Sequence, residues 1–210
     1  MAKKYPNNQA NLSGRGLTKF PNELVESESL RLLDLSDNPL KKIPDGIGKL
    51  LKLETLNIAN CQLSALPKGF AKLQSLRELN LSNNAFEEPP EVICELKSLR
   101  KLDISFTILI NLPEAIPNLT LLEELDVLGI SFSNQAPEEL GGLSNLNKLS
   151  IRWLKGLPEI LGKLPALREL NLDFMRTKAD RNAVQKILKE NGVKLKVASG
   201  NDYFLKLTSM

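Results

Sequence analysis

The sequence predicts an α/β repeat solenoid, in which about nine short parallel strands form a concave sheet and short helical or 3-10 segments form the convex side. The first observation is a repeat: the residue at the centre of each Leu-x-Leu step recurs every 23 residues. This series runs Leu12, Leu35, Ile58, Leu81, Ile104 and Val127, and continues at Ile151, Leu172 and Leu195 after intervals of 24, 21 and 23 residues. The second observation is that a proline follows most steps at a similar distance. The third is size, because 210 residues of which 42% are hydrophobic suffice for one domain.

The first complete unit, residues 30–52, shows why each repeat forms a strand and a turn. It reads LRLLDLSDNPLKKIPDGIGKLLK, and its Leu33-Asp34-Leu35 step alternates apolar and polar residues as a strand does. The segment from Pro44 to Ile47 suits the first turn of a short helix. One unit cannot bury its own leucines, so stacking is required, and each buried Leu or Ile side chain then contributes about 1.5 to 3 kcal/mol.

The loop after each strand has one position that faces inward. That position holds Asn38, Cys61, Asn84, Thr107, Ile130, Leu154 and Met175 in successive repeats. The two asparagine amides are expected to satisfy buried backbone groups, and Cys61 and Thr107 to do so more weakly. The later apolar residues cannot, so the C-terminal half is expected to close its loops differently.

Both ends depart from the repeat. Asn7 and Ala10 stand where leucines belong, so the N-terminal edge needs cover from Tyr5 and Pro6, from a partner or from a second copy. At the other end, Asp180 is predicted to cap a longer helix, and a last strand follows at residues 193–197. We therefore expect a solenoid over residues 10–178 and a helix-strand cap, continuous with it, over residues 179–210.

The repeat fits the pattern L-x-x-L-x-L-x-x-N-x-L-x-x-L-P-x-x-I-x-x-L, and on this pattern the chain resembles the leucine-rich repeat family. The closest type is the 23-residue repeat of many bacterial and intracellular signalling proteins, and the resemblance covers about residues 10–178. It implies a right-handed superhelix. It also implies that a partner binds the concave face, at the variable positions between the leucines.

Composition excludes several classes of function. Histidine is absent, which removes the commonest general base and metal ligand, and the net charge of +3 gives little attraction for nucleic acid or anionic lipid. Cys61 and Cys94 fall on different faces of the repeat, so neither a disulfide nor a zinc site is expected. No apolar stretch has the length of a signal peptide or a membrane span. We expect a cytoplasmic monomer without cofactor, metal, nucleic acid or membrane partner. The alternative is an effector that is secreted without a signal peptide.

Two columns of outward residues run across the predicted sheet. The first is Leu32, Thr55, Glu78, Lys101, Glu124, Lys148 and Glu169, whose alternating charges predict a ladder of ion pairs with a structural role. The second column places Asp103 beside Asp126. Such paired carboxylates could serve acid-base chemistry or hold a cation, but no nucleophile or histidine is near, which favours a solvated polar face.

Two further columns change character along the chain. Small polar residues in the early repeats give way to Phe106, Leu128, Arg152, Trp153, Asp173 and Phe174. Aromatic and arginine side chains are the usual anchors of protein interfaces, so these residues, with Asp103 and Asp126, form the predicted partner-binding set. The alternative is that irregular loops fold the aromatic rings into the core.

The sequence therefore predicts a non-catalytic protein-protein interaction module, either a signalling adaptor or a bacterial effector. The alternative is the substrate-recognition part of a ubiquitin-ligase-like enzyme whose catalytic domain is missing here. Residues 179–210 are too few for such a domain, and they contain no cysteine.

Overall fold

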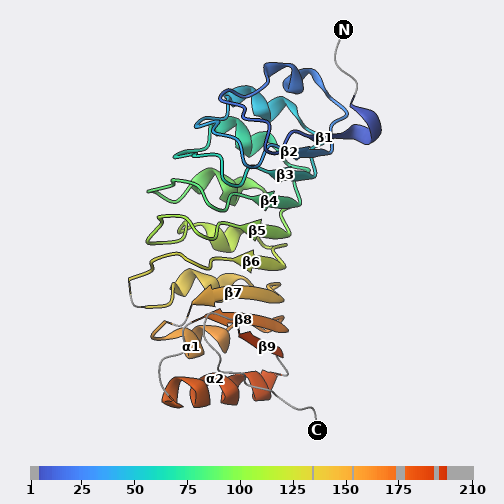
Figure 1. The fold of residues 1–210 in the computed structure, drawn as a ribbon. Helices are drawn as coiled ribbons and strands as arrows, with labels where there is room; N and C mark the ends of the chain where they lie inside the picture. The colour runs from blue at the N-terminus through green and yellow to red at the C-terminus, as the bar shows by residue number, and fades with distance from the viewer. Residues whose placement is uncertain (1–4, 134, 153, 174–177, 192–193, 198–210) are drawn as a thin grey trace.

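A computed structural model describes residues 5–133, 135–152, 154–173, 178–191 and 194–197. Within these residues nine strands form one parallel sheet, and their order in the sheet is their order in the chain (Figure 1). The strands are β1 (Gln9–Asn11), β2 (Leu32–Asp34), β3 (Thr55–Asn57), β4 (Glu78–Asn80), β5 (Lys101–Asp103), β6 (Glu124–Asp126), β7 (Lys148–Arg152), β8 (Glu169–Asp173) and β9 (Lys194–Val197). The predicted solenoid is confirmed.

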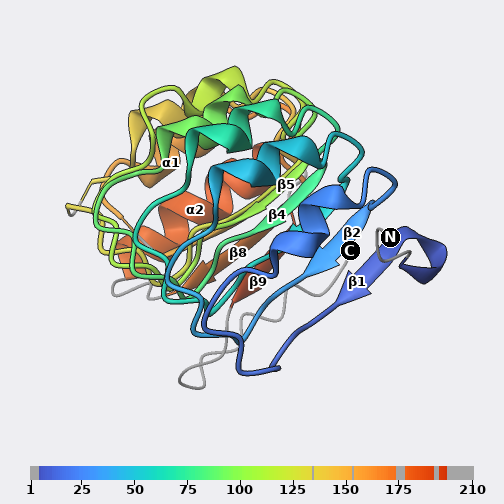
Figure 2. The same cartoon turned by 90° about the horizontal axis from the view of Figure 1, so that it is seen from above.

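Short helical segments form the second layer, opposite the strands (Figure 2). The 3-10 segments of this layer are η2 (Asn22–Glu26), η3 (Asp45–Lys49), η4 (Lys68–Lys72), η5 (Glu91–Glu95), η6 (Ile116–Asn118) and η7 (Glu138–Gly142), whereas η1 (Pro6–Asn8) directly precedes β1. Two α-helices follow, α1 (Leu157–Leu161) and α2 (Lys178–Asn191). The prediction that Asp180 caps the longer helix is wrong, because α2 begins at Lys178.

The strands stack without any shift in register. Leu33 of β2 faces Leu56 of β3, and each following strand places its central leucine in the same row. The 24-residue interval lies between β6 and β7, and the connecting segment takes up the extra residue, because Glu124 still pairs with Lys148. The core between the two layers consists of the repeated apolar residues, and Leu33, Leu56 and Leu79 are at most 2% exposed. Because the register is fixed, the outward columns predicted from the sequence are real neighbours on the concave face.

Asn84 shows how the loops close in the early repeats. Its amide group donates hydrogen bonds to the carbonyl oxygens of Ile58 and Leu81, and its Oδ1 accepts from the backbone N–H groups of Cys61 and Leu63. Asn38 makes similar hydrogen bonds two repeats earlier: its amide group donates to the carbonyl oxygens of Leu12 and Leu35, and its Oδ1 accepts from the backbone N–H of Leu17. The predicted role of these asparagines is confirmed.

The other residues at this loop position divide as the sequence predicts. Thr107 Oγ1 donates to the carbonyl of Ile104, and the Cys61 thiol donates to the carbonyl of Leu35. Ile130 and Leu154 are buried instead, so apolar packing replaces the asparagine network in the C-terminal half. Met175 lies outside the described residues.

The N-terminal end of the core is partly covered by the chain itself. Ala10 of β1 is 2% exposed, and Tyr5 is half-buried against the apolar core. Burial raises the pKa of the Tyr5 hydroxyl, with Glu23 adding to the rise. Tyr5 therefore contributes to the cover that the shortened first repeat needs.

Candidate interaction surface

The concave face contains a hollow of about 370 Å³ that extends from β3 to β7. We call it the concave groove. Its charged and polar lining residues are Thr55, Asn57, Glu78, Asn80, Lys101, Asp103, Glu124, Asp126, Lys148 and Ser150. Five consecutive strands thus present one polar surface, since every strand contributes the residues at the same two outward positions.

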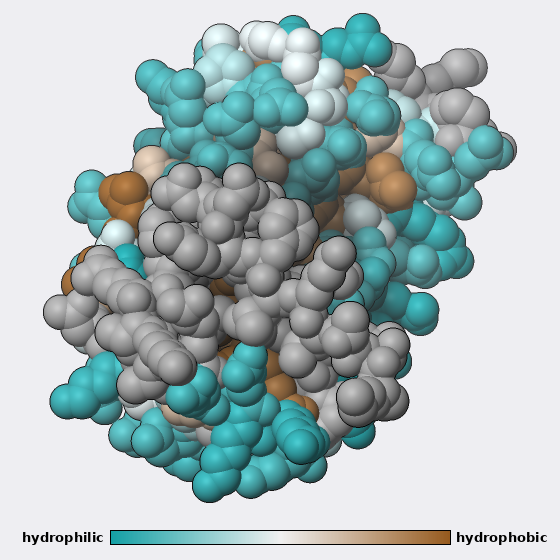
Figure 3. Space-filling view, turned by 60° about the horizontal axis from the view of Figure 1, so that its bottom comes forward, coloured by the Kyte–Doolittle hydropathy of each residue, from teal (hydrophilic) through white to brown (hydrophobic). Residues whose placement is uncertain are grey.

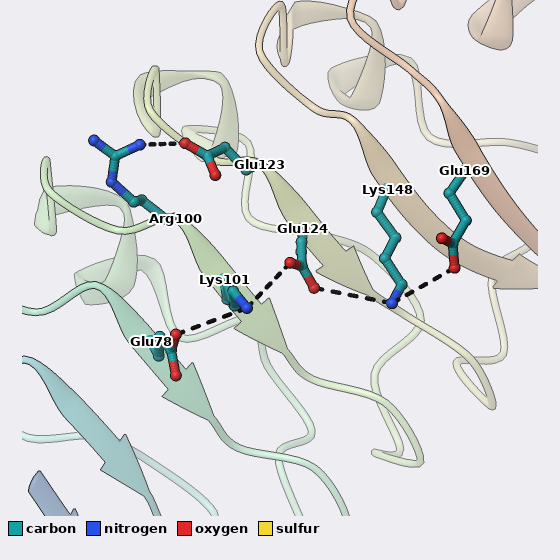
Figure 4. Close-up of polar contacts among 7 residues, drawn as sticks. All are labelled: Glu78, Arg100, Lys101, Glu123, Glu124, Lys148 and Glu169. Atoms are coloured by element: carbon teal, nitrogen blue, oxygen red, sulfur yellow. Dashed lines mark hydrogen bonds and ion pairs between the residues drawn. The ribbon is translucent and has the colours of Figure 1, made fainter. Parts of the chain in front are cut away.

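Ion pairs cross the concave groove from strand to strand (Figure 4). Lys101 Nζ lies 3.1 Å from a carboxylate oxygen of Glu124 and 3.8 Å from one of Glu78. Lys148 Nζ lies 4.0 Å from Glu124 and 3.6 Å from Glu169. The carboxylates of Glu124 and Glu78 raise the pKa of Lys101. The predicted ladder is present, and each of its exposed pairs contributes about 0.2 to 1 kcal/mol.

Asp103 and Asp126 face each other across β5 and β6 and also hold the turns that follow their strands. Oδ1 of Asp103 accepts from the backbone N–H of Ser105 at 2.9 Å, and Oδ1 of Asp126 accepts from that of Leu128 at 3.0 Å. Burial raises the pKa of Asp126, and the charge of Asp103 raises it further. The charge of Asp126 is therefore disfavoured by burial and by Asp103, and Lys148 offsets part of this effect.

Phe106 stands at the end of β5 with an unusual backbone. Its φ of 53° is left-handed, and the equivalent residues in neighbouring repeats, Asn60, Asn83 and Gly129, share this conformation. Asparagine and glycine adopt it readily, whereas a bulky side chain does so at a cost. The Phe106 side chain is nevertheless 60% exposed. Strain on an exposed aromatic residue is a recognised mark of a functional position.

The ring of Phe106 lies against the next repeat at Gly129. A Cβ atom added to Gly129 would stand only 2.6 Å from Cδ1 of Phe106, so no larger residue fits beneath the ring as it lies. The backbone N–H of Phe106 donates to the carbonyl of Leu128 at 2.7 Å. Phe106 is thus fixed in place, although most of its surface faces solvent.

The structure describes only some of the remaining residues of the predicted partner-binding set. Leu128 and Arg152 are half-buried, and Arg152 faces Asp173 in the register of β7 and β8. Trp153 and Phe174 lie outside the described residues. Asp103 and Asp126 line the concave groove, and Phe106 and Leu128, which follow them in the chain, are joined by a backbone hydrogen bond just after β5 and β6 end.

Sequence reasoning missed two residues beside Phe106. Ile108 and Ile110 are 58% and 57% exposed, and besides Phe106 only Leu51 and Leu121 are exposed large hydrophobic residues in the described part of the chain. The described residues on the face drawn in Figure 3 are mostly hydrophilic. The sequence does contain a sign of their exposure, because the residues equivalent to Ile108 and Ile110 in the neighbouring repeats are small or polar. They are Ala85 and Ser131 for Ile108, and Glu87 and Ser133 for Ile110.

Other functional chemistry has little support in the described part of the chain. No three acidic, cysteine or histidine side chains gather there in a way that could hold a metal ion. Both cysteines are buried and unpaired with each other, and burial raises the pKa of the Cys94 thiol to about 12. None of the described helices has the length and apolar character needed to cross a membrane.

Comparisons with known proteins agree on the fold. The family model of the leucine-rich repeat region matches residues 19–159, whereas no curated protein sequence matches the chain. The Arabidopsis receptor kinase HAESA, solved with the peptide hormone IDA and the co-receptor SERK1, is 27% identical and superposes with a TM-score of 0.64. The match covers 79% of this chain and 30% of that chain.

Two further structures are similar at lower identity and support the fold alone. The internalin InlF from Listeria monocytogenes is 15% identical over 91% of this chain and 56% of its own, with a TM-score of 0.67. The plant peptide hormone receptor RGFR1, in complex with RGF2, is 23% identical over 74% of this chain and 31% of its own, with a TM-score of 0.57.

Proposed function

The chain belongs to the leucine-rich repeat family, and from this premise we propose that it is a non-catalytic module that binds a protein partner on its concave face. The observation that carries the proposal is the concave groove, a hollow that crosses five strands and is lined by charged and polar side chains together with the central leucines of four strands. Each lining side chain stands on a rigid strand, so the surface is organised before any partner arrives. Preorganised surfaces lose little conformational entropy on binding.

The electrostatics of the concave groove support a protein ligand. Asp103 and Asp126 present two adjacent carboxylates, while Lys101 and Lys148 are already engaged by glutamates. A partner with a Lys or Arg side chain opposite the two aspartates would gain a favourable pair and relieve their repulsion. Two structural relatives were solved with peptide hormones, so a peptide or protein segment is a reasonable ligand for this fold.

The rim set extends the proposed binding surface toward the C-terminus. It comprises Phe106, Leu128, Arg152, Trp153, Asp173 and Phe174. The strained and exposed Phe106 supports this assignment, since a folded protein keeps such a residue at a cost to its stability. We assign the rim as the source of apolar anchors and the concave groove as the source of charge recognition.

A role without catalysis fits the chemistry of the described residues. Histidine is absent from the sequence, and the buried Cys94 thiol has a pKa of about 12, so it is protonated at neutral pH and is no nucleophile. Free thiols also fit a reducing compartment, and we propose a cytoplasmic adaptor or effector. A ubiquitin-transfer assay on the full chain tests the enzymatic alternative, and transfer activity would refute the proposal.

The binding test compares two double variants in affinity capture from a cell extract. Thr55→Arg with Glu78→Arg places two long side chains in the concave groove, and neither original side chain is buried or holds the backbone. Lys68→Glu with Lys72→Glu changes the opposite, convex layer at η4. We expect the groove variant alone to lose the captured partner while both variants melt near the wild type. Loss with the convex variant alone would contradict a concave binding site.

The rim is tested separately by Trp153→Ala with Phe174→Ala. We expect this variant to lose the partner and to keep the circular dichroism spectrum and melting temperature of the wild type. If the two changes unfold the protein, both rings belong to the core and the rim assignment fails.

A further inference from the structure

The loop after β5 carries three exposed apolar side chains in one row. Phe106, Ile108 and Ile110 are 60%, 58% and 57% exposed, and they alternate with the buried Thr107 and Leu109. We call these three residues the apolar ridge. Because only alternate residues of the loop face solvent, the three side chains form one continuous strip on the flank where the chain leaves the sheet.

The repeat itself does not require these residues. The loops after β2, β3, β4 and β6 carry, at the same three positions, Asp37, Pro39 and Lys41; Asn60, Gln62 and Ser64; Asn83, Ala85 and Glu87; and Gly129, Ser131 and Ser133. These residues are polar or small, and all are exposed or half-buried. The apolar ridge is therefore a local departure that exposes hydrophobic surface without a packing reason, which is typical of an interaction site.

An acidic hollow of about 640 Å³ adjoins the apolar ridge and shares Ile110 with it. Five glutamates from three successive loops and their 3-10 segments line it, and these are Glu88, Glu91, Glu114, Glu138 and Glu139. Leu112 and Phe132 add apolar lining. Among the described lining residues there is no lysine or arginine, so the five carboxylates create a local negative field on a chain whose net charge is +3.

We infer that the apolar ridge and the acidic hollow form a second docking surface, which takes an extended protein segment carrying both apolar and Lys or Arg side chains. The apolar side chains would cover Phe106 and Ile108, and the cations would enter the hollow beside Ile110. This surface shares Phe106 with the rim set, but Ile108, Ile110 and the acidic hollow do not line the concave groove, so it goes beyond the binding on the concave face proposed above. Anionic lipid and nucleic acid are disfavoured occupants, because five carboxylates repel phosphate groups.

The test uses a synthetic peptide in which lysine and leucine alternate, and a matched peptide with glutamate in place of each lysine. The full chain is labelled at its isoleucine methyl groups and titrated with each peptide while NMR spectra are recorded. We expect the Ile108 and Ile110 methyl signals to shift with the lysine peptide alone. Because Asp103 and Asp126 in the concave groove also attract cations, the methyl shifts of Ile108 and Ile110, and not binding alone, report the acidic hollow.

A matched variant removes the apolar ridge without disturbing the repeat. Phe106→Asn, Ile108→Gln and Ile110→Ser together install the residues that the loop after β3 already carries at the same positions. We expect at least about a tenfold loss of affinity for the lysine peptide, as is typical when interface anchors are removed. Leu51→Ser is the control, since Leu51 is 59% exposed and precedes β3 at the other end of the strands. It should bind as the wild type does.

Three outcomes overturn the inference. They are equal binding of the glutamate peptide, equal binding by the ridge variant, and a concentration-dependent dimer that the ridge variant abolishes in the absence of peptide. The last result would identify the apolar ridge as a contact between copies of the chain. The groove variant Thr55→Arg with Glu78→Arg should still bind the lysine peptide, so a failure here is distinguishable from a failure of concave binding.

Discussion

At the residue scale, Phe106 brings together a left-handed backbone and an exposed aromatic ring. The two neighbouring repeats before it use Asn60 and Asn83 in the same conformation. A residue that lowers stability and leaves its ring in solvent is best explained by binding. Its contribution to stability can be measured apart from any partner.

Phe106→Asn is expected to raise the free energy of unfolding by about 1 kcal/mol, because asparagine tolerates the left-handed region better than a bulky residue does. Urea denaturation measures this change. The reciprocal variant Asn83→Phe should lower the free energy of unfolding by a similar amount. A destabilised Phe106→Asn protein would show instead that the contact of the ring with Gly129 outweighs the backbone strain.

The Asp103 and Asp126 pair predicts a dependence on pH. Burial and the neighbouring carboxylate raise the pKa of Asp126 above its ordinary value of 3.8, so the folded state binds its proton more tightly than the unfolded state does. The stability that this group contributes is present at low pH and is lost as pH rises through the folded pKa.

Asp126→Asn should therefore raise the free energy of unfolding at pH 7 by about 0.2 to 1 kcal/mol, the range for cross-strand pairs. The difference from the wild type should disappear as pH falls below the ordinary carboxyl pKa. Asn57 and Asn80 already accept the equivalent turn hydrogen bonds, so asparagine fits this column. Asp34→Asn is the control, because the strand partners of Asp34 are Asn11 and Asn57. A pH-independent gain for Asp126→Asn would refute the explanation.

The two cysteines are expected to be inert in the folded protein. Burial raises the pKa of Cys61, and it raises that of Cys94 to about 12, so neither thiol forms much thiolate near neutral pH. A colorimetric disulfide reagent should modify both only as fast as the protein unfolds. Rapid labelling of either cysteine without denaturant would contradict the burial described here.

At the element scale, the loop asparagines hold successive repeats together. Asn84 satisfies two backbone N–H groups and two carbonyls that lie in neighbouring repeats. A buried backbone group left without a partner costs about 1 to 3 kcal/mol. The boundary between these two repeats therefore depends on the Asn84 side chain.

Asn84→Ala is expected to lower the free energy of unfolding by at least about 2 kcal/mol, since two buried donors lose their acceptor. Denaturant unfolding followed by circular dichroism measures the loss. Glu87→Ala, at an exposed position of the same loop, should change stability little. An equal effect of the two substitutions would show that water replaces the asparagine amide.

Elements differ in how far the sequence predicts them. The register of β2 to β6 follows from the 23-residue interval, because a constant interval fixes which side chains are neighbours. The start of α2 does not follow, since Asp180 suits an N-cap but the helix continues to Lys178. The left-handed turn at Phe106 follows from the column that contains Asn60, Asn83 and Gly129, whereas the direction of the Phe106 ring does not follow from the sequence. The acidic hollow depends on how three loops pack, which the alignment of strands leaves undetermined.

At the scale of the whole molecule, each repeat contacts mainly its neighbours. Surface residues can therefore be replaced without a large change in the free energy of unfolding. The leucines carry the fold, whereas Thr55 and Glu78 of the concave groove and the three residues of the apolar ridge are exposed or half-buried, so their replacement leaves the core intact. Binding variants should therefore keep the melting temperature of the wild type. A protein of this construction can change partners without changing its fold.

The most direct test of the central claim is the dissociation constant of a captured partner, measured for the wild type and for the two charge variants at one salt concentration. A binding site on the concave face predicts at least about a tenfold weakening for Thr55→Arg with Glu78→Arg, as expected at an interface centre, and no change for Lys68→Glu with Lys72→Glu. Unchanged affinity in the groove variant, together with weakened affinity in the convex variant, would contradict it.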